Sequence, residues 1–550
     1  MTRNVQLLTL PTEILGIILG LCALNDLTEL RQVCRAINSL AEPLIFSTLT
    51  INTHSWMDYA ANQVKSLAEG ETHASLYARR LVVGSVDHRF PYVHSKFDSE
   101  IQYILHMKKY LAPALASLKN VRSVRWIPQP PESDWVMDVV SRFIPQLSLL
   151  EKLEVEAYWA MVPPLPDLPN LQTLSLKIGS NNLTDFAAAM KSATKLTSLT
   201  IDCCGVVDWE KKADLNEIFE TFTEPRQLRG LNLSDCSIHL SEGVVQHVRS
   251  LRSLKLKDDQ HGEPSDLEEN RDEDWQLADE EEERVPAPVL VDRIKQIRPK
   301  STAFWSTLQR ESVKLEELDI DKVDHALFDY LGSYTGLRDL HLPNIDAVRR
   351  VLVDHLADYF YTWAFPKHVA TLERLCLVSA YTSTWCFGPK NSFLFFQCQK
   401  LRQLQIGWDA EDVDAKKNLF GILDLSAALP LLDELTISYS FNRSIRGRNR
   451  VSLRSYRMGI YDKLARSALP KYGPIDTKKH LRYILVHRLK WELFCRGGVW
   501  RYRYVGIKGP HLTLVRTAEK SEDEDDEDGD QVQDKQADGD GDIVKASSPV

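Results

Sequence analysis

A hydrophobic pattern, Leu-x-x-Leu-x-(Leu/Ile/Val), recurs along residues 150–437 and limits the folds that this chain can adopt. Successive copies start 21–35 residues apart, except for one interval of 64 residues. Repetition at such a period is typical of stacked structural units. A degenerate earlier copy runs through Leu118, Val121, Val124 and Trp126. The strict copies start at Leu150, Leu171, Leu196, Leu228, Leu251, Leu315, Leu337, Leu372, Leu401 and Leu432.

The alternation within each copy predicts one short β-strand per unit. In Leu174-Ser175-Leu176, both leucines face one side of the strand and the serine faces the other. Stacked units would bury these leucines in a ladder of parallel strands with helices packed outside. The pattern resembles the leucine-rich repeat, which implies an α/β solenoid. Only Cys204 and Cys236 match the family's Asn/Cys position, so we expect irregular repeats. One leucine-rich α/β domain without solenoid order is the alternative.

The strand positions that point away from the leucines would line the concave face of such a solenoid. They are small or polar and differ from one another, which favours a protein-binding surface over a catalytic site. The alternative is that they are ordinary solvated strand residues. These positions are Arg125, Glu154, Ser175, Thr200, Asn232, Lys255, Asp319, His341, Cys376, Gln405 and Thr436. We expect all of them except Cys376 to contact a substrate.

Residues 10–49 form a second pattern, with apolar residues at helical spacing. Pro11 suits the first turn of a helix, where its missing N–H has no partner. Asn25-Asp26 predicts a break between two helices, and Asp26 with Glu29 predicts an acidic capping box. The apolar positions surround both helices, which is more than so small a unit can bury. We therefore expect a helical hairpin with a spare apolar face for a partner.

This segment resembles the F-box in Leu10-Pro11, Glu13-Ile14, Ile17-Ile18, Asp26-Leu27 and Val33-Cys34-Arg35. Many family members carry tryptophan where this chain has Ile37, a change that removes a large apolar area. The resemblance implies docking on a Skp-type adaptor bound to a cullin scaffold. The anchors would be Leu10, Pro11, Ile14, Ile17, Ile18, Leu21, Leu27, Leu30, Val33, Cys34 and Ile37. Some of them must instead hold the hairpin together, and the sequence does not separate the two roles.

Charge is strongly segregated along the chain, although the net charge is only −10. Residues 257–284 carry 14 acidic and 3 basic side chains, and residues 519–542 carry 13 and 2. Both segments have little to bury, so we expect a disordered insert at 257–288 and a disordered tail at 517–550. Residues 443–516 carry 19 basic and 3 acidic side chains. We expect this segment to cap the array, with binding of nucleic acid as a less favoured alternative.

The chain therefore divides into an F-box-like domain (1–50), a connecting segment or solenoid start (51–117), irregular repeats (118–442), a basic cap (443–516) and the tail. Within these parts we expect helices at 56–69, 99–110, 289–309 and 478–494. Strands are expected at 80–83, 499–505 and 511–515, the last two forming a terminal hairpin.

The sequence contains no motif of a known catalytic or nucleotide-binding site. Its nine cysteines are scattered, without zinc-ligand spacing, and suit a reducing compartment. No signal peptide and no run of 18 apolar residues is present, so we expect no membrane partner and a cytoplasmic or nuclear location. We expect no cofactor, no metal and no enzymatic activity of the chain itself.

Together, the two resemblances imply the substrate-recognition subunit of an SCF-type cullin–RING E3 ubiquitin ligase. The chain would hold a protein substrate near the partner that carries ubiquitin, so catalysis would be proximity alone. The alternative is a non-degradative scaffold that uses its acidic segments to bind basic proteins, such as nuclear ones.

Overall fold

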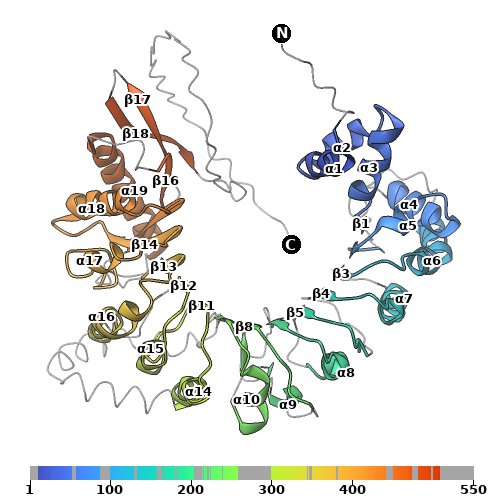
Figure 1. Ribbon diagram of the computed structural model, residues 1–550, viewed down its shortest axis with the longest axis horizontal. Coiled ribbons are helices and arrows are strands. Elements are labelled where there is room, and N and C mark those ends of the chain that lie inside the picture. The colour runs from blue at the N-terminus through green and yellow to red at the C-terminus, as the bar shows by residue number, and fades with distance from the viewer. Residues whose placement is uncertain are drawn as a thin grey trace, which may run out of the picture. The chain divides into compact units, whose positions relative to one another are not determined.

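The computed structural model describes residues 10–52, 57–86, 100–128, 133–157, 164–165, 167–179, 183–203, 213–214, 216–219, 222, 224–237, 240–257, 299–343, 345, 350–379, 382–440, 450–473, 481–487, 489–496 and 499–507 (Figure 1). Contact clustering divides the chain into Met1–Leu512 and Thr513–Val550, and every described residue belongs to the first unit. Residues 258–288 of the expected insert, the expected tail and the strand expected at 511–515 lie outside the described residues, whereas Lys257 is the last residue of a strand.

The described unit is a mixed α/β structure built on one 16-stranded sheet that does not close on itself. Strands β1 to β16 run parallel, and β17 and β18 are antiparallel additions at one end. In sheet order the strands are Thr48–Ile51 (β1), Arg80–Val83 (β2), Ser123–Trp126 (β3), Lys152–Ala157 (β4), Thr173–Ile178 (β5), Ser198–Asp202 (β6), Gly230–Ser234 (β8), Ser253–Lys257 (β10), Glu317–Ile320 (β11), Asp339–Leu342 (β12), Arg374–Leu377 (β13), Gln403–Asp409 (β14), Glu434–Ser440 (β15), Tyr483–Val486 (β16), Leu489–Arg496 (β17) and Val499–Ile507 (β18).

Helices follow most of the parallel strands and cover one face of the sheet (Figure 1). We call the other face, which no helix of the described residues covers, the helix-free face. The helices of this layer are Met57–Glu69 (α4), Ala74–Tyr77 (α5), Glu100–Ser117 (α6), Asp134–Phe143 (α7), Thr184–Ser192 (α8), Asn216–Phe219 (α9), Glu242–Val248 (α10), Pro299–Arg310 (α14), His325–Gly332 (α15), Arg350–Tyr359 (α16), Ser392–Phe395 (α17), Ala415–Ala428 (α18) and Arg450–Ala468 (α19). A two-stranded sheet joins Ala213–Asp214 (β7) to Cys236–Ser237 (β9).

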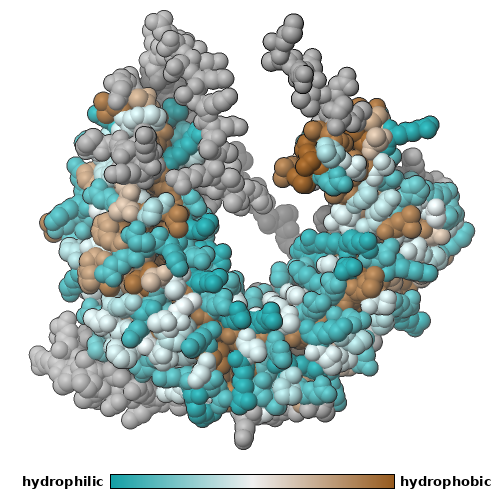
Figure 2. Space-filling model, viewed as in Figure 1, coloured by the Kyte–Doolittle hydropathy of each residue, from teal (hydrophilic) through white to brown (hydrophobic). Residues whose placement is uncertain are grey.

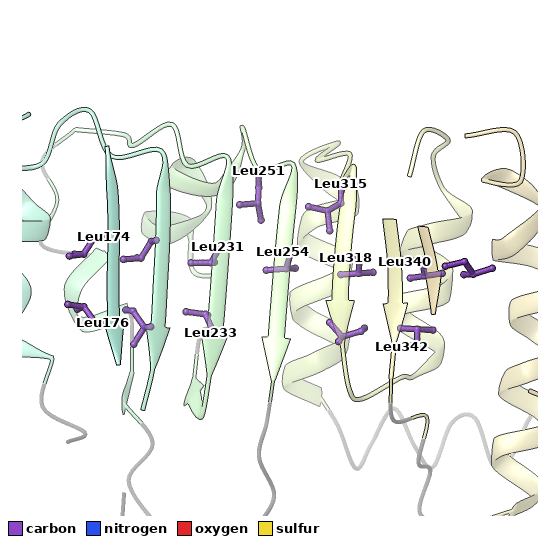
Figure 3. Close-up of a cluster of buried hydrophobic side chains, with 14 of the residues drawn as sticks. Leu174, Leu176, Leu231, Leu233, Leu251, Leu254, Leu315, Leu318, Leu340 and Leu342 are labelled. Atoms are coloured by element: carbon purple, nitrogen blue, oxygen red, sulfur yellow. The ribbon is translucent and has the colours of Figure 1, made fainter. Parts of the chain in front are cut away.

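The leucine pattern forms the core between the sheet and these helices. Aligned register places Leu174, Leu231, Leu254, Leu318 and Leu340 in one continuous row (Figure 3). All are 2% exposed or less. Burying each such side chain contributes about 2 kcal/mol before the cost of ordering the chain. The prediction of one parallel strand per leucine pattern is therefore confirmed.

The sheet begins earlier than the leucine pattern does. Strands β1 and β2 pair with each other and with β3, so the segment 51–117 already belongs to the ladder. The strand at 80–83 and the helices α4 and α6 confirm the expectations for 80–83, 56–69 and 99–110. Helix α14 covers residues 299–309 of the helix expected at 289–309 and extends one residue past it, while residues 289–298 lie outside the described part.

The expected helix at 478–494 is wrong in the described residues, which form β16 and β17 instead. Leu489, Trp491 and Leu493 are buried while Lys490 and Glu492 are half-buried, which is the alternation of a strand. The free edge of β15 pairs with β16, with Thr436 aligned to Leu485. Backbone pairing at this edge therefore outweighs the apolar spacing. The strand expected at 499–505 lies within β18, which pairs antiparallel with β17. The hairpin expected between this strand and residues 511–515 lies outside the described residues.

Candidate partner-binding surfaces

The N-terminal segment folds into three helices rather than the expected two. They are Thr12–Gly20 (α1), Leu24–Leu30 (α2) and Arg35–Ile45 (α3). The first break falls at Leu21–Ala23, so Asn25 and Asp26 lie inside α2. The capping-box expectation is wrong for this reason: Ala23 occupies the N-cap, and no side chain caps the helix.

A small core of their own holds the three helices together. Leu19, Leu27, Ile37 and Ala41 are each 5% exposed or less. Leu30 and Cys34 pack against this cluster and are half-buried. The structure thus moves Leu27 and Ile37 from the expected docking surface to the core, because they face the neighbouring helices and not solvent.

A set of large apolar side chains remains outside that core. Ile14, Ile17, Ile18 and Leu21 recur at helical spacing along α1, with Leu21 at its C-cap, and their exposed fractions range from 37% to 84%. Val33 is 67% exposed. Figure 2 shows hydrophobic side chains gathered over the N-terminal helices. We call Ile14, Ile17, Ile18, Leu21, Leu24 and Val33 the N-terminal apolar surface.

Sequence reasoning missed one member of this surface, Leu24, which is 59% exposed at the start of α2. The predicted break at Asn25-Asp26 comes directly after Leu24, and Leu24 is not among the predicted anchors. Among the other expected anchors, Pro11 is exposed and Leu10 is half-buried.

The N-terminal helices are tied to the sheet by short connections. Helix α3 ends at Ile45 and β1 starts at Thr48. The Glu42 carboxylate lies 3.2 Å from Nδ1 of His73, which precedes α5. Phe46 packs against the main core of the sheet. A partner bound to the N-terminal apolar surface would therefore be held close to the end of the ladder.

The expected concave-face residues form one aligned row on the helix-free face. Register places Arg125, Glu154, Ser175, Thr200, Asn232, Lys255, Asp319, His341, Cys376, Gln405 and Thr436 on successive strands from β3 to β15. Asp319 and Cys376 are buried, and the others are half-buried. The structure thus brings these residues together over most of the sheet.

Ion pairs cross the strands at the N-terminal end of this row. The Glu156 carboxylate accepts hydrogen bonds from Arg125 and Lys177, at 3.0 and 3.1 Å. Burial opposes ionisation of Glu156, but these two cations outweigh burial and lower the pKa of its carboxyl. The charges are therefore largely satisfied within the face.

A hollow of about 360 Å³ opens on the helix-free face over β10 to β15. Nδ1 of His341 lies 2.7 Å from Oδ1 of Asp319. Burial opposes ionisation of Asp319, but the hydrogen bond and charge of His341, with Lys257 and Lys255, lower the pKa of this carboxyl. The hollow offers carboxylate, imidazole, amide and hydroxyl groups to a partner.

Cys376 and His341 are neighbours on adjacent strands, but the thiol is not activated. Burial and the charge of Asp319 raise the pKa of Cys376 to about 12, so the thiol stays protonated. In the described part of the chain, no group of three His, Cys, Asp or Glu side chains could hold a metal ion. None of the described helices is long and apolar enough to cross a membrane.

The described residues therefore present two surfaces: an apolar helical surface and a polar sheet face. No family model matches the sequence, and no curated protein matches it. The functional interpretation consequently rests on these surfaces and on the residues that compose them.

Proposed function

We propose that this chain is a substrate receptor of an SCF-type cullin–RING ubiquitin ligase. In this proposal the N-terminal apolar surface docks on a Skp-type adaptor, and the helix-free face holds a protein substrate. The observation that carries the proposal is the exposed apolar surface of α1 and α2, which exists beside a complete small core. Exposed apolar surface of this kind marks protein-interaction sites.

The division between core and surface supports the proposal further. Helix α1 buries Leu15 and Leu19 and exposes Ile17 and Leu21. The exposed apolar side chains add no burial energy to the isolated helical unit. They would be buried if α1 lay in a hydrophobic groove of a partner, as amphipathic helices do. Leu27 and Ile37 then act by positioning the helices. The direct anchors would be the exposed residues, with Leu10 and Pro11 at the edge.

The helix-free face suits the second half of the proposal. It runs over many strands and presents a different side chain at each, so it can recognise an extended protein surface. The chain would contribute no reacting group. It would hold a substrate lysine near the ubiquitin thioester carried by a partner, which raises the effective concentration of the two.

Co-purification with a Skp-type adaptor tests the docking half. Leu21→Asp places a charge on a side chain that is 84% exposed, so it should leave the fold intact and weaken docking at least about thirtyfold if Leu21 is an interface hot spot. Leu105→Asp is the matched control, because Leu105 is 62% exposed on α6, away from α1. Equal recovery of the adaptor with wild type and Leu21→Asp would reject this surface as the docking site.

Substrate turnover separates the proposal from a scaffold that binds basic proteins through its acidic segments. The partner captured by the full chain should accumulate in cells that express Leu21→Asp instead of wild type. An unchanged level of that partner, with docking lost, would favour the scaffold.

A further inference from the structure

The C-terminal hairpin carries a pocket that is separate from both surfaces described above. It has a volume of about 480 Å³ and is formed by β17, β18, the end of α19 and the short helix Leu469–Lys471 (η5). Arginines and aromatic residues dominate its lining, and none of the described residues that line it carries a carboxylate. The residues that matter for the argument are Arg466, Trp491, Phe494, Arg501, Arg503 and Tyr504.

The acidic groups near the pocket are already engaged. Glu492 lies 3.3 Å from Arg503 and 3.8 Å from Arg482, and it also accepts a hydrogen bond from the Tyr483 hydroxyl at 2.9 Å. Arg466 and Arg501 are both exposed, and no carboxylate of the described residues forms a salt bridge with either of them. Among the described residues, these two guanidinium groups therefore have no salt-bridge partner.

Stacking holds part of this cationic surface in place. The Arg466 guanidinium lies 4.0 Å from the centroid of the Tyr504 ring, and Arg503 lies 5.1 Å from that of Phe494. Trp491 is 1% exposed, and its indole N–H has no acceptor in the described part of the chain. A stacked guanidinium loses less freedom on binding, and its planar fork matches carboxylate and phosphate oxygens.

We propose that this pocket binds the oxyanion of an acidic peptide segment, either a carboxylate or a phosphate carried by a side chain. Aromatic rings line the pocket beside the guanidinium groups, and a less polar surrounding strengthens charge-assisted hydrogen bonds to the oxyanion. The volume accommodates one or two side chains. Nucleic acid instead gains affinity by neutralising many successive phosphates, which needs a long basic track rather than cations that converge on one hollow.

This inference does not rest on the proposed ligase function. Its test uses the full chain and three fluorescein-labelled probes of equal length: an Asp/Glu-rich peptide, the same peptide with one phosphoserine, and a single-stranded DNA. Binding is followed by fluorescence anisotropy with wild type, Arg466→Gln and Arg501→Gln. Lys463→Gln is the matched control, because Lys463 is exposed on the same helix as Arg466 but does not line the pocket.

We expect wild type to bind a peptide probe and each arginine variant to weaken it about tenfold, the effect of one lost charge-assisted bond. Lys463→Gln should bind as wild type does. On the unaltered chain, sulfate should displace the peptide better than chloride at equal ionic strength. The tighter of the two peptides identifies phosphate or carboxylate as the preferred group. The proposal would be overturned if wild type bound neither peptide, or if both arginine variants bound the peptides as tightly as wild type does. Binding of the DNA probe alone would overturn it as well.

Discussion

Asp319 shows how a single residue can organise the helix-free face. Its carboxylate lies at the centre of the row, 2.7 Å from His341 and 3.9 Å from Lys257, with only 12% of its side chain exposed. Because the pKa of its carboxyl is lowered, the ionised form is the one that the folded state stabilises. Asp319→Asn keeps the shape and removes the charge, and it should cost about 1–3 kcal/mol at neutral pH.

The pH dependence of this loss has a defined sign. A carboxyl with a lowered folded-state pKa stabilises the fold fully above its ordinary pKa of 3.8, and this contribution disappears as pH falls through the folded-state pKa. Urea denaturation of wild type and Asp319→Asn should therefore show a gap in the free energy of unfolding that is full at pH 7 and shrinks in strong acid. Glu151→Gln, which breaks an exposed pair with Arg122, should cost less than about 1 kcal/mol at neutral pH. A gap that persists unchanged in acid would contradict this assignment.

Ile37 marks the limit of sequence reasoning at the residue scale. The resemblance to the F-box places a docking anchor there, because apolar identity is visible in the sequence. The direction in which the side chain faces depends on the angles at which the three helices cross, and these angles cannot be predicted from the sequence. The same limit explains why Leu24 was missed and Leu27 was assigned to the surface.

Placing the family's tryptophan at this position tests its burial. Ile37 is 4% exposed within a small cluster, so Ile37→Trp should overpack it and lower the free energy of unfolding of the N-terminal helices by about 1–3 kcal/mol. Amide hydrogen exchange of α1 to α3 measures this directly. Slower exchange, or tighter adaptor binding without loss of stability, would place Ile37 at the interface instead.

The turn between β16 and β17 distinguishes the observed strand pair from the helix predicted at 478–494. His487 has φ of +54°, a left-handed conformation that β-branched residues strongly disfavour. His487→Val should therefore be at least about 1 kcal/mol less stable than His487→Asn, since asparagine tolerates this region. In the interior of a helix, valine and asparagine have nearly equal propensity, so equal stabilities would favour the helix that the apolar spacing of 478–494 predicts. Thermal unfolding of the two variants makes the comparison.

Elements with a strong local period were predictable, and elements defined by pairing were not. The leucine rows of β4 to β15 could be predicted, because apolar and polar residues alternate in each copy of the leucine pattern. Strand β16 (Tyr483–Val486) has no such pattern, and it is a strand through its pairing with β15 and β17. The sequence places the break between the first two helices at Asn25-Asp26, because this pair is the stronger local turn signal. In the structure the break lies at Leu21–Ala23, and α2 already starts at Leu24.

At the scale of the molecule, the structure joins a short helical unit to a long parallel sheet through a two-residue link, from Ile45 to Thr48. This connection leaves the small core of α1 to α3 distinct from the core of the sheet. The helices can therefore present apolar side chains to one partner while the helix-free face remains available to another. The row of polar residues on that face could be predicted from alternation. The hollow over β10 to β15 could not, because it depends on which short and long side chains become neighbours across strands.

The central claim is that the N-terminal apolar surface binds a Skp-type adaptor. Isothermal titration calorimetry of the purified full chain with the purified adaptor tests it most directly. We predict saturable one-to-one binding with a negative heat-capacity change, because apolar area is buried. Leu21→Asp should weaken the binding at least about thirtyfold, and Leu105→Asp should leave it unchanged. Absence of binding by wild type, or equal affinity of wild type and Leu21→Asp, would contradict the account.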